Sequence, residues 1–130
     1  MAHLNEDGRA LQGLMLESMT AADNYRRLAR CFQGWQAESL GRMARESRAQ
    51  GACIGGIFAL VTGEEPPRMA VLPDTGLLTA RLKKAYARAM RMLSACEVHT
   101  EDREYGPVFQ RLATRQQDHC RRILEIIGSL

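Results

Sequence analysis

The sequence predicts an all-α protein, a four-helix bundle with a long crossover between the second and third helices. Four stretches carry apolar residues at intervals of three and four, the spacing of one helix face. β-branched residues never form the alternating runs that indicate strands. Three of the four prolines lie within residues 64–74. That segment cannot be helical throughout, so we expect it to be the crossover.

The composition is that of an ordinary globular domain. With 130 residues, 45% hydrophobic and 25% charged, the chain is expected to form one domain over residues 1–130. The net charge of +3 is small and dispersed, which argues against a nucleic-acid partner. The longest nearly apolar run, residues 51–62, is too short to cross a bilayer, so no membrane association is expected.

The first two helices are expected at about residues 5–32 and 37–62. Asn5 is a suitable N-cap for the first helix. Gly34 permits the turn between the two helices, and Gly63 is a natural C-cap for the second. A short connection of this kind predicts that the two helices are antiparallel neighbours.

The other two helices are expected at about residues 75–98 and 106–128. The third would begin after the crossover, with Asp74 or Thr75 as its cap. The fourth opens with Pro107, and proline is favoured in a first helical turn because its missing N–H needs no partner there. The two predicted pairs, first with second and third with fourth, are then joined by the crossover.

Three glycines lie inside the second predicted helix, at Gly51, Gly55 and Gly56. Each costs about 1 kcal/mol relative to alanine, so each needs a reason. One interpretation is the close approach of another helix, including one from a second subunit. The other is local packing against Tyr25 or Tyr86 within one bundle.

The centres of the apolar faces are polar but uncharged. They are Ser18 in the first helix, Ser47 and Gln50 in the second, and Gln116 and His119 in the fourth. Residues three apart on a helix project to the same side. Di-metal four-helix bundles place Glu and Glu-x-x-His ligands in such positions. The sequence contains no Glu-x-x-His, and neutral side chains cannot offset the repulsion between two adjacent cations.

The chain resembles the ferritin-like superfamily, and specifically the small bacterial rubrerythrin-like proteins. The resemblance is carried by residues 24–29, 43–50, 57–63, 104–113 and 119–124. It implies a di-iron centre for oxidation or peroxide reduction in an intracellular protein. Most of the implied ligand places hold other residues, namely Ser18, Ser47, Gln50, Ala89 and Gln116, and His119 is the ligand that remains.

The leading prediction is therefore a degenerate ferritin-like protein without an intact di-iron site or other cofactor. We expect a non-catalytic binding or structural module that forms a homodimer. Four widely spaced cysteines without a C-x-x-C pair, and an acidic N-terminus without an apolar signal core, predict a cytoplasmic protein with reduced thiols. His119 is expected to be buried, neutral and hydrogen-bonded to Gln116 or Gln50.

Two alternatives remain open. The first is a metal-dependent oxidoreductase or iron-handling protein with iron or manganese at a rebuilt site of His119, Glu46 and Glu17. Each acid is adjacent in sequence to a polar residue at the centre of an apolar helix face, Glu17 to Ser18 and Glu46 to Ser47. Adjacent helical positions point about 100° apart, so both acids are expected instead at the bundle rim or in solvent. The second is a small-molecule pocket in the core, lined by Met15, Met43, Met92 and the neutral polar residues.

Overall fold

The computed structural model describes residues 8–130, and within that range the chain forms four α-helices and no strand. The expected start of the first helix near Asn5 lies outside the described residues. The helices are α1 (Gly8–Ala29), α2 (Trp35–Thr62), α3 (Leu78–Val98) and α4 (Gly106–Gly128). The predicted all-α class and the bounds of the fourth helix are confirmed.

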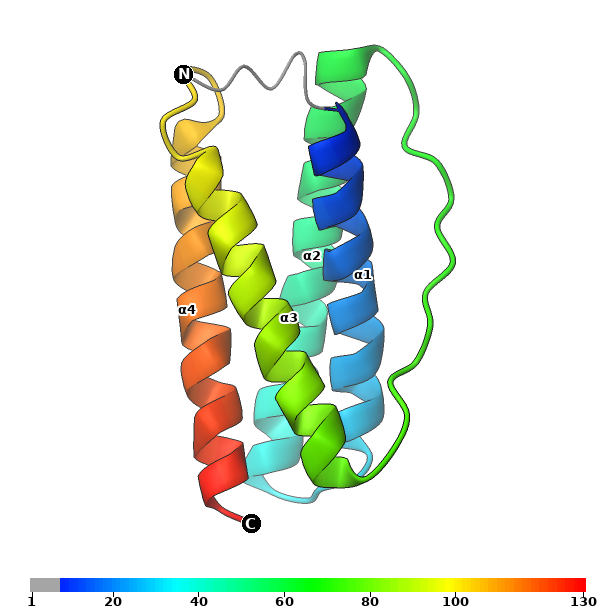
Figure 1. The fold of residues 1–130 in the computed structure, drawn as a ribbon, viewed down its shortest axis with the longest axis vertical. Helices are drawn as coiled ribbons and strands as arrows, with labels where there is room; N and C mark the ends of the chain where they lie inside the picture. Colours follow the sequence, from blue (N-terminus) through cyan, green and yellow to red (C-terminus); the bar gives the residue numbers. More distant parts are fainter. Residues whose placement is uncertain (1–7) are drawn as a thin grey trace.

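The connection between α2 and α3, residues 63–77, runs the length of the bundle on the outer side of α1 (Figure 1). The helices α1 and α2 are antiparallel neighbours, as are α3 and α4, and α1 also packs against α3. Because the connection returns the chain to the end where α2 began, α2 and α3 run in the same direction (Figure 1). The expected crossover is therefore present.

The first helix is shorter than predicted, ending at Ala29 rather than near Phe32. Its apolar pattern continues, and Phe32 is still half-buried against the core. The backbone, however, tightens into i→i−3 bonds, from the Arg30 and Cys31 amides to carbonyls three residues back (3.2 and 2.9 Å). Gly34 then adopts φ 68°, and α2 begins at Trp35, slightly before its expected start.

The third helix starts at Leu78, and neither Asp74 nor Thr75 caps it. The Asp74 carboxylate instead accepts a 2.7 Å ion-paired hydrogen bond from Arg88 of α3, with both side chains largely buried. The Asp74 amide donates to Asn24 Oδ1 of α1 at 2.7 Å. Gly76, at φ 104°, then turns the chain before the helix can begin. These contacts fasten the end of the crossover to α1 and α3.

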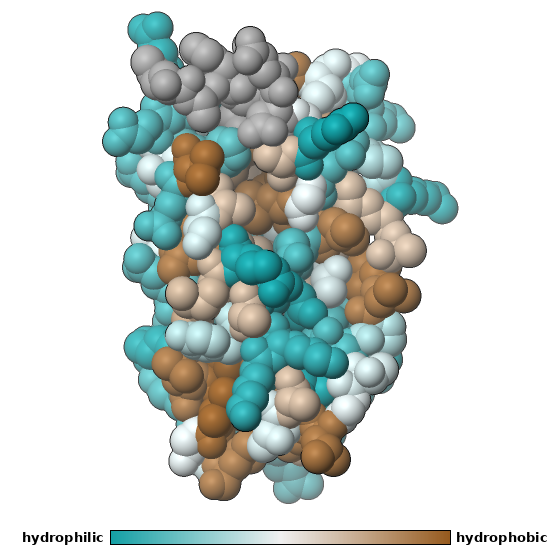
Figure 2. Space-filling view, in the orientation of Figure 1, coloured by the Kyte–Doolittle hydropathy of each residue, from teal (hydrophilic) through white to brown (hydrophobic). Residues whose placement is uncertain are grey.

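The apolar faces of all four helices meet in one core. On the face seen in Figure 2, hydrophilic side chains run down the middle, where α3 lies, with hydrophobic groups beside them. Among residues 8–130, no helix is long and apolar enough to cross a membrane. The mid-level of the core contains the neutral polar side chains that the sequence singles out.

Candidate functional site

Every position that the resemblance assigns to a metal ligand is fully buried, and the positions come from all four helices. Each has a relative exposure of 0%; they are Ser18, Ser47, Gln50, Ala89, Gln116 and His119. The helical spacing of three and four therefore located the interior correctly at each place. We call the five polar members of this set, all except Ala89, the polar layer.

A directional chain of hydrogen bonds crosses the polar layer from α4 to α1. Gln116 Nε2 donates to Gln50 Oε1 at 2.9 Å, and Gln50 Nε2 donates to Ser18 Oγ at 2.9 Å. Ser18 Oγ in turn donates to the Leu14 carbonyl at 2.8 Å, one turn back in its own helix. Met92 of α3 lies beside the chain, its sulfur 3.7 Å from Gln50 Nε2. Three of the five residues of the polar layer are therefore linked by hydrogen bonds, while Ser47 Oγ has no partner among the described residues.

His119 pairs with Glu46 rather than with Gln116 or Gln50, so the expected partners were wrong. His119 Nε2 lies 2.9 Å from Glu46 Oε1. The amide nitrogens of both glutamines already donate along the chain toward Ser18. The Glu46 side chain, 32% exposed, starts at the bundle rim and extends inward to the imidazole. A carboxylate only accepts, so the neutral imidazole carries its proton on Nε2.

Burial lowers the pKa of His119 below its ordinary value. The hydrogen bond and the charge of Glu46 raise the pKa of His119 and offset that effect only in part. The ring of Tyr25 meets the imidazole edge-on, with ring centroids 5.6 Å apart. His119 Nδ1 and the Tyr25 hydroxyl have no hydrogen-bond partner among the described residues. The imidazole is therefore held neutral in a largely apolar surround.

Acid is expected to destabilise the fold through His119. Because its folded pKa is depressed, the unfolded chain binds more protons, so stability falls as pH drops through the unfolded value of 6.5 and is unaffected well above it. The slope attributable to one histidine is at most about 1.4 kcal/mol per pH unit. Urea unfolding between about pH 5 and pH 8 measures it, and His119→Gln is expected to flatten the curve. If NMR titration of the folded protein gave the His119 imidazole a pKa at or above the unfolded value of 6.5, this prediction would be wrong.

Glu17 does not join His119 and Glu46. Its carboxylate lies 3.3 Å from Arg91 and 3.8 Å from Arg88, both on α3. Within residues 8–130, no group of three or more His, Cys, Asp and Glu side chains gathers at distances that could hold a metal ion. The structure thus brings together two of the three residues of the expected rebuilt site and places the third with arginines.

The polar layer does not fit a di-metal centre. The amide nitrogens of Gln116 and Gln50 and the hydroxyl of Ser18 donate along one chain that ends at the Leu14 carbonyl, and Gln116 Oε1 has no hydrogen-bond partner among the described residues. These side chains carry no charge, while Ala89 offers no ligand atom at all. Glu46 brings one carboxylate to this level of the core through its contact with His119. Two divalent ions would require several carboxylates there to offset their mutual repulsion.

A groove opens on the outside of the bundle, between α1, α2 and the crossover, whereas the second alternative from the sequence had placed a pocket in the core. Met43 and Met92 are buried in the core and do not line it, whereas Met15 does. Its volume is about 560 Å³. The other residues that line the groove, chiefly Arg48, Met19 and Met69, were not predicted from the sequence. The glycines inside α2 were a signal for the groove.

Neither Tyr25 nor Tyr86 packs closely on the glycines inside α2. A Cβ on Gly51 would lie 2.7 Å from Met19 Sδ, and one on Gly55 would lie 3.3 Å from Met15 Sδ. Close packing of α1 methionines on α2 therefore accounts for two of them, in agreement with the interpretation of local packing but with different partners. A Cβ on Gly56 would meet no atom within 4 Å.

Comparison with family models, with curated proteins and with solved structures found no significant match in any of the three.

Proposed function

We propose that this protein is a ferritin-like bundle in which a neutral polar layer replaces the di-metal site, and that it acts as a non-catalytic binding module. The order of helices supports the first part: two antiparallel pairs joined by one long crossover are typical of ferritin-like bundles. The burial of all six implied ligand places at one level of the core supports it further.

The observation that carries the proposal is the hydrogen-bond chain from Gln116 through Gln50 to Ser18. A site built for oxidation chemistry keeps open coordination positions and negative charge. Here Gln116, Gln50 and Ser18 hydrogen-bond to one another at three of the implied ligand places, while Ser47 Oγ and Gln116 Oε1 are buried without a hydrogen-bond partner among the described residues. The pairing stabilises a fixed arrangement of α1, α2 and α4, which is the requirement of a scaffold that binds rather than reacts.

Metal analysis tests the proposal. Protein purified without chelator and titrated with Mn²⁺ or Fe²⁺ is expected to show no saturable two-ion site, because the polar layer has no charge to balance one. The variant His119→Ala is expected to behave like the wild type in that titration. Two ions per chain, lost in His119→Ala, would overturn the proposal.

A single divalent ion held by His119 and Glu46 is the second candidate, and the contact between these two side chains favours it. Imidazole and carboxylate are both common ligands of iron and manganese. The same titration distinguishes it, because one ion per chain would be lost in Glu46→Ala as well as in His119→Ala. Glu17→Ala would retain it, since Glu17 pairs with arginines.

The proposal includes the cytoplasmic homodimer expected from the sequence. Cys31 and Cys53 are exposed free thiols, which is compatible with a reducing compartment. Leu60 and Leu72 are 75% and 76% exposed, and such side chains are available to a second copy. Sedimentation equilibrium measures the oligomeric state directly.

A further inference from the structure

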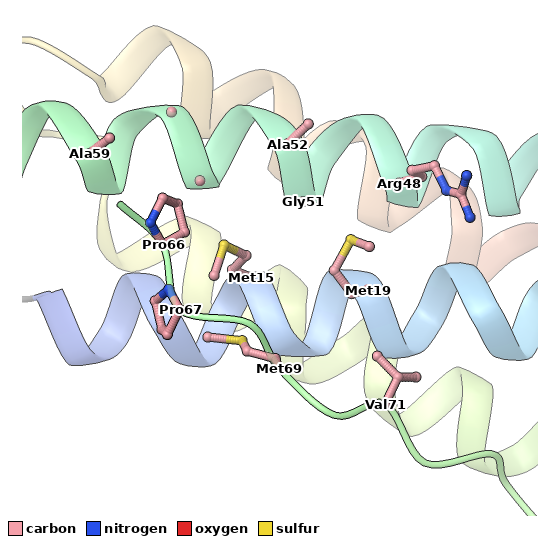
Figure 3. Close-up of a pocket in the computed structure, with 12 residues that line it drawn as sticks. Met15, Met19, Arg48, Gly51, Ala52, Ala59, Pro66, Pro67, Met69 and Val71 are labelled. Carbon is pink, nitrogen blue, oxygen red and sulfur yellow. The ribbon is translucent and has the colours of Figure 1, made fainter. Parts of the chain in front are cut away.

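The groove beside α1 has three walls from segments far apart in the sequence (Figure 3). One face of α2 forms the first wall, two methionines of α1 form the second, and the crossover forms the third. Its volume of about 560 Å³ lies within the range of about 300–1,000 Å³ found for small-molecule pockets. The lining includes Met15 and Met19 of α1, Arg48 and Gly56 of α2, and Pro66 and Met69 of the crossover.

Gly56 contributes to this space without any packing reason of its own. A Cβ there would touch nothing, so the absent side chain leaves a surface at backbone level in the α2 wall. A glycine inside a helix costs about 1 kcal/mol relative to alanine. Gly55, by contrast, is needed for the approach of Met15 and Pro66. The lack of a side chain at Gly56 therefore leaves the groove open and is not needed for the packing of the helices.

The groove has a charge at one end and none along its length. Of the described residues that line it, Arg48 alone is charged, and the structure gives its guanidinium no ion pair with any described residue. Arg48 and Ala59 mark the two ends of the α2 wall (Figure 3). They are eleven positions apart, about 16 Å along a helix. The shape and charge together fit an elongated apolar molecule with an anionic head.

We propose that this groove binds a free amphiphilic carboxylate, with its alkyl chain along Met15, Met19 and Met69 and its head group at Arg48. Methionine side chains are flexible and polarisable, and they adapt to apolar ligands of varied shape. A guanidinium recognises a carboxylate through two parallel hydrogen bonds. The inference rests on the proposed binding role and gives it a ligand class, but it uses no residue of the polar layer.

Calorimetric titration of the full-length protein with dodecanoate, below its micelle concentration, tests the proposal. Gly56→Leu fills the groove, while Gly13→Leu is the matched control, because Gly13 is also an exposed interior helical glycine with no atom within 4 Å of its Cβ position. Both substitutions raise helix propensity, so both variants are expected to fold. Arg48→Gln, titrated with dodecanoate and with the neutral dodecanol, isolates the head group.

We expect saturable binding of one dodecanoate in the wild type and in Gly13→Leu, and at least about a tenfold loss of affinity in Gly56→Leu. Arg48→Gln is expected to weaken dodecanoate about tenfold while leaving dodecanol unchanged. NMR signals of the Met15, Met19 and Met69 methyl groups are expected to shift on binding. The dodecanoate titration and the metal titration measure different sites. If one of the two proposals fails, the other can still be tested.

Three results would overturn the inference. One is the lack of saturable dodecanoate binding, or an equal loss in the two leucine variants. Another is binding only to phosphatidylglycerol vesicles, which would assign the groove to a membrane surface. The third is a dimer that Gly56→Leu abolishes and dodecanoate does not displace, which would assign the groove to a second copy of the chain.

Discussion

Replacing Gln50 with leucine is expected to destabilise the protein by about 2–4 kcal/mol. Gln50 accepts from Gln116 and donates to Ser18, so its loss leaves a buried amide of Gln116 without an acceptor. A buried polar group stripped of its partner incurs its full desolvation cost, whereas a hydrogen bond exchanged for an apolar contact costs little. Urea unfolding at neutral pH measures the difference in the free energy of unfolding.

The control is the triple variant Ser18→Ala, Gln50→Leu, Gln116→Leu. It removes every member of the chain together, so no donor is stranded, and we expect its stability to return to within about 1 kcal/mol of the wild type. A triple variant less stable than Gln50→Leu alone would contradict this account, because it would mean that the amides contribute through packing rather than through their pairing. Coupling of this kind is expected only among side chains in contact.

Placing glutamate or histidine at the five ligand positions that the resemblance implies is expected to create a metal site. The variant Ser18→Glu, Ser47→Glu, Gln50→His, Ala89→Glu, Gln116→Glu places two Glu-x-x-His pairs and two further carboxylates at buried positions from four helices. Without metal, the crowded carboxylates destabilise the fold through burial and mutual repulsion. With Co²⁺ at about a hundred times the dissociation constant, we expect a recovery of about 2.7 kcal/mol, together with a cobalt absorption spectrum.

Adding His119→Ala to that variant is the matched control, and it is expected to weaken the cobalt signal because one ligand is lost. If the metal-free variant does not fold, circular dichroism during refolding with and without Co²⁺ provides the readout. A folded variant that gains no stability from Co²⁺ would show that the five positions do not converge, and the ferritin-like interpretation would then be wrong.

Helical periodicity located the interior well, but it misplaced the end of α1 and the start of α3. The spacing of apolar residues correctly placed Ser18, Gln50 and Gln116 in the core, because the same side of a helix recurs every three or four residues. The end of α1 was misjudged because Phe32 packs on the core without being helical. The cap of α3 was misjudged because the carboxylate of Asp74 binds Arg88, a partner fourteen residues away.

The partners of the polar layer were only partly predictable. Glu46 starts on a neighbouring face of α2, and its long side chain reaches His119 across the rim, a reach that backbone periodicity does not encode. The interior glycines of α2 were a sequence signal for one wall of the groove, but its full outline was not predictable for a similar reason. Its third wall is the crossover, which has no regular period, so the positions of Pro66 and Met69 depend on the path that the chain takes around α1.

The crossover also divides the chain into two helical hairpins, each with a short connection and mostly local contacts. Local contacts lose little chain entropy when they form, so each hairpin can assemble before the two halves dock. The bond between Gln116 and Gln50 joins the halves and can form only at docking. This bond between the halves should therefore be absent from the folding transition state, so its strength governs how slowly the protein unfolds rather than how fast it folds.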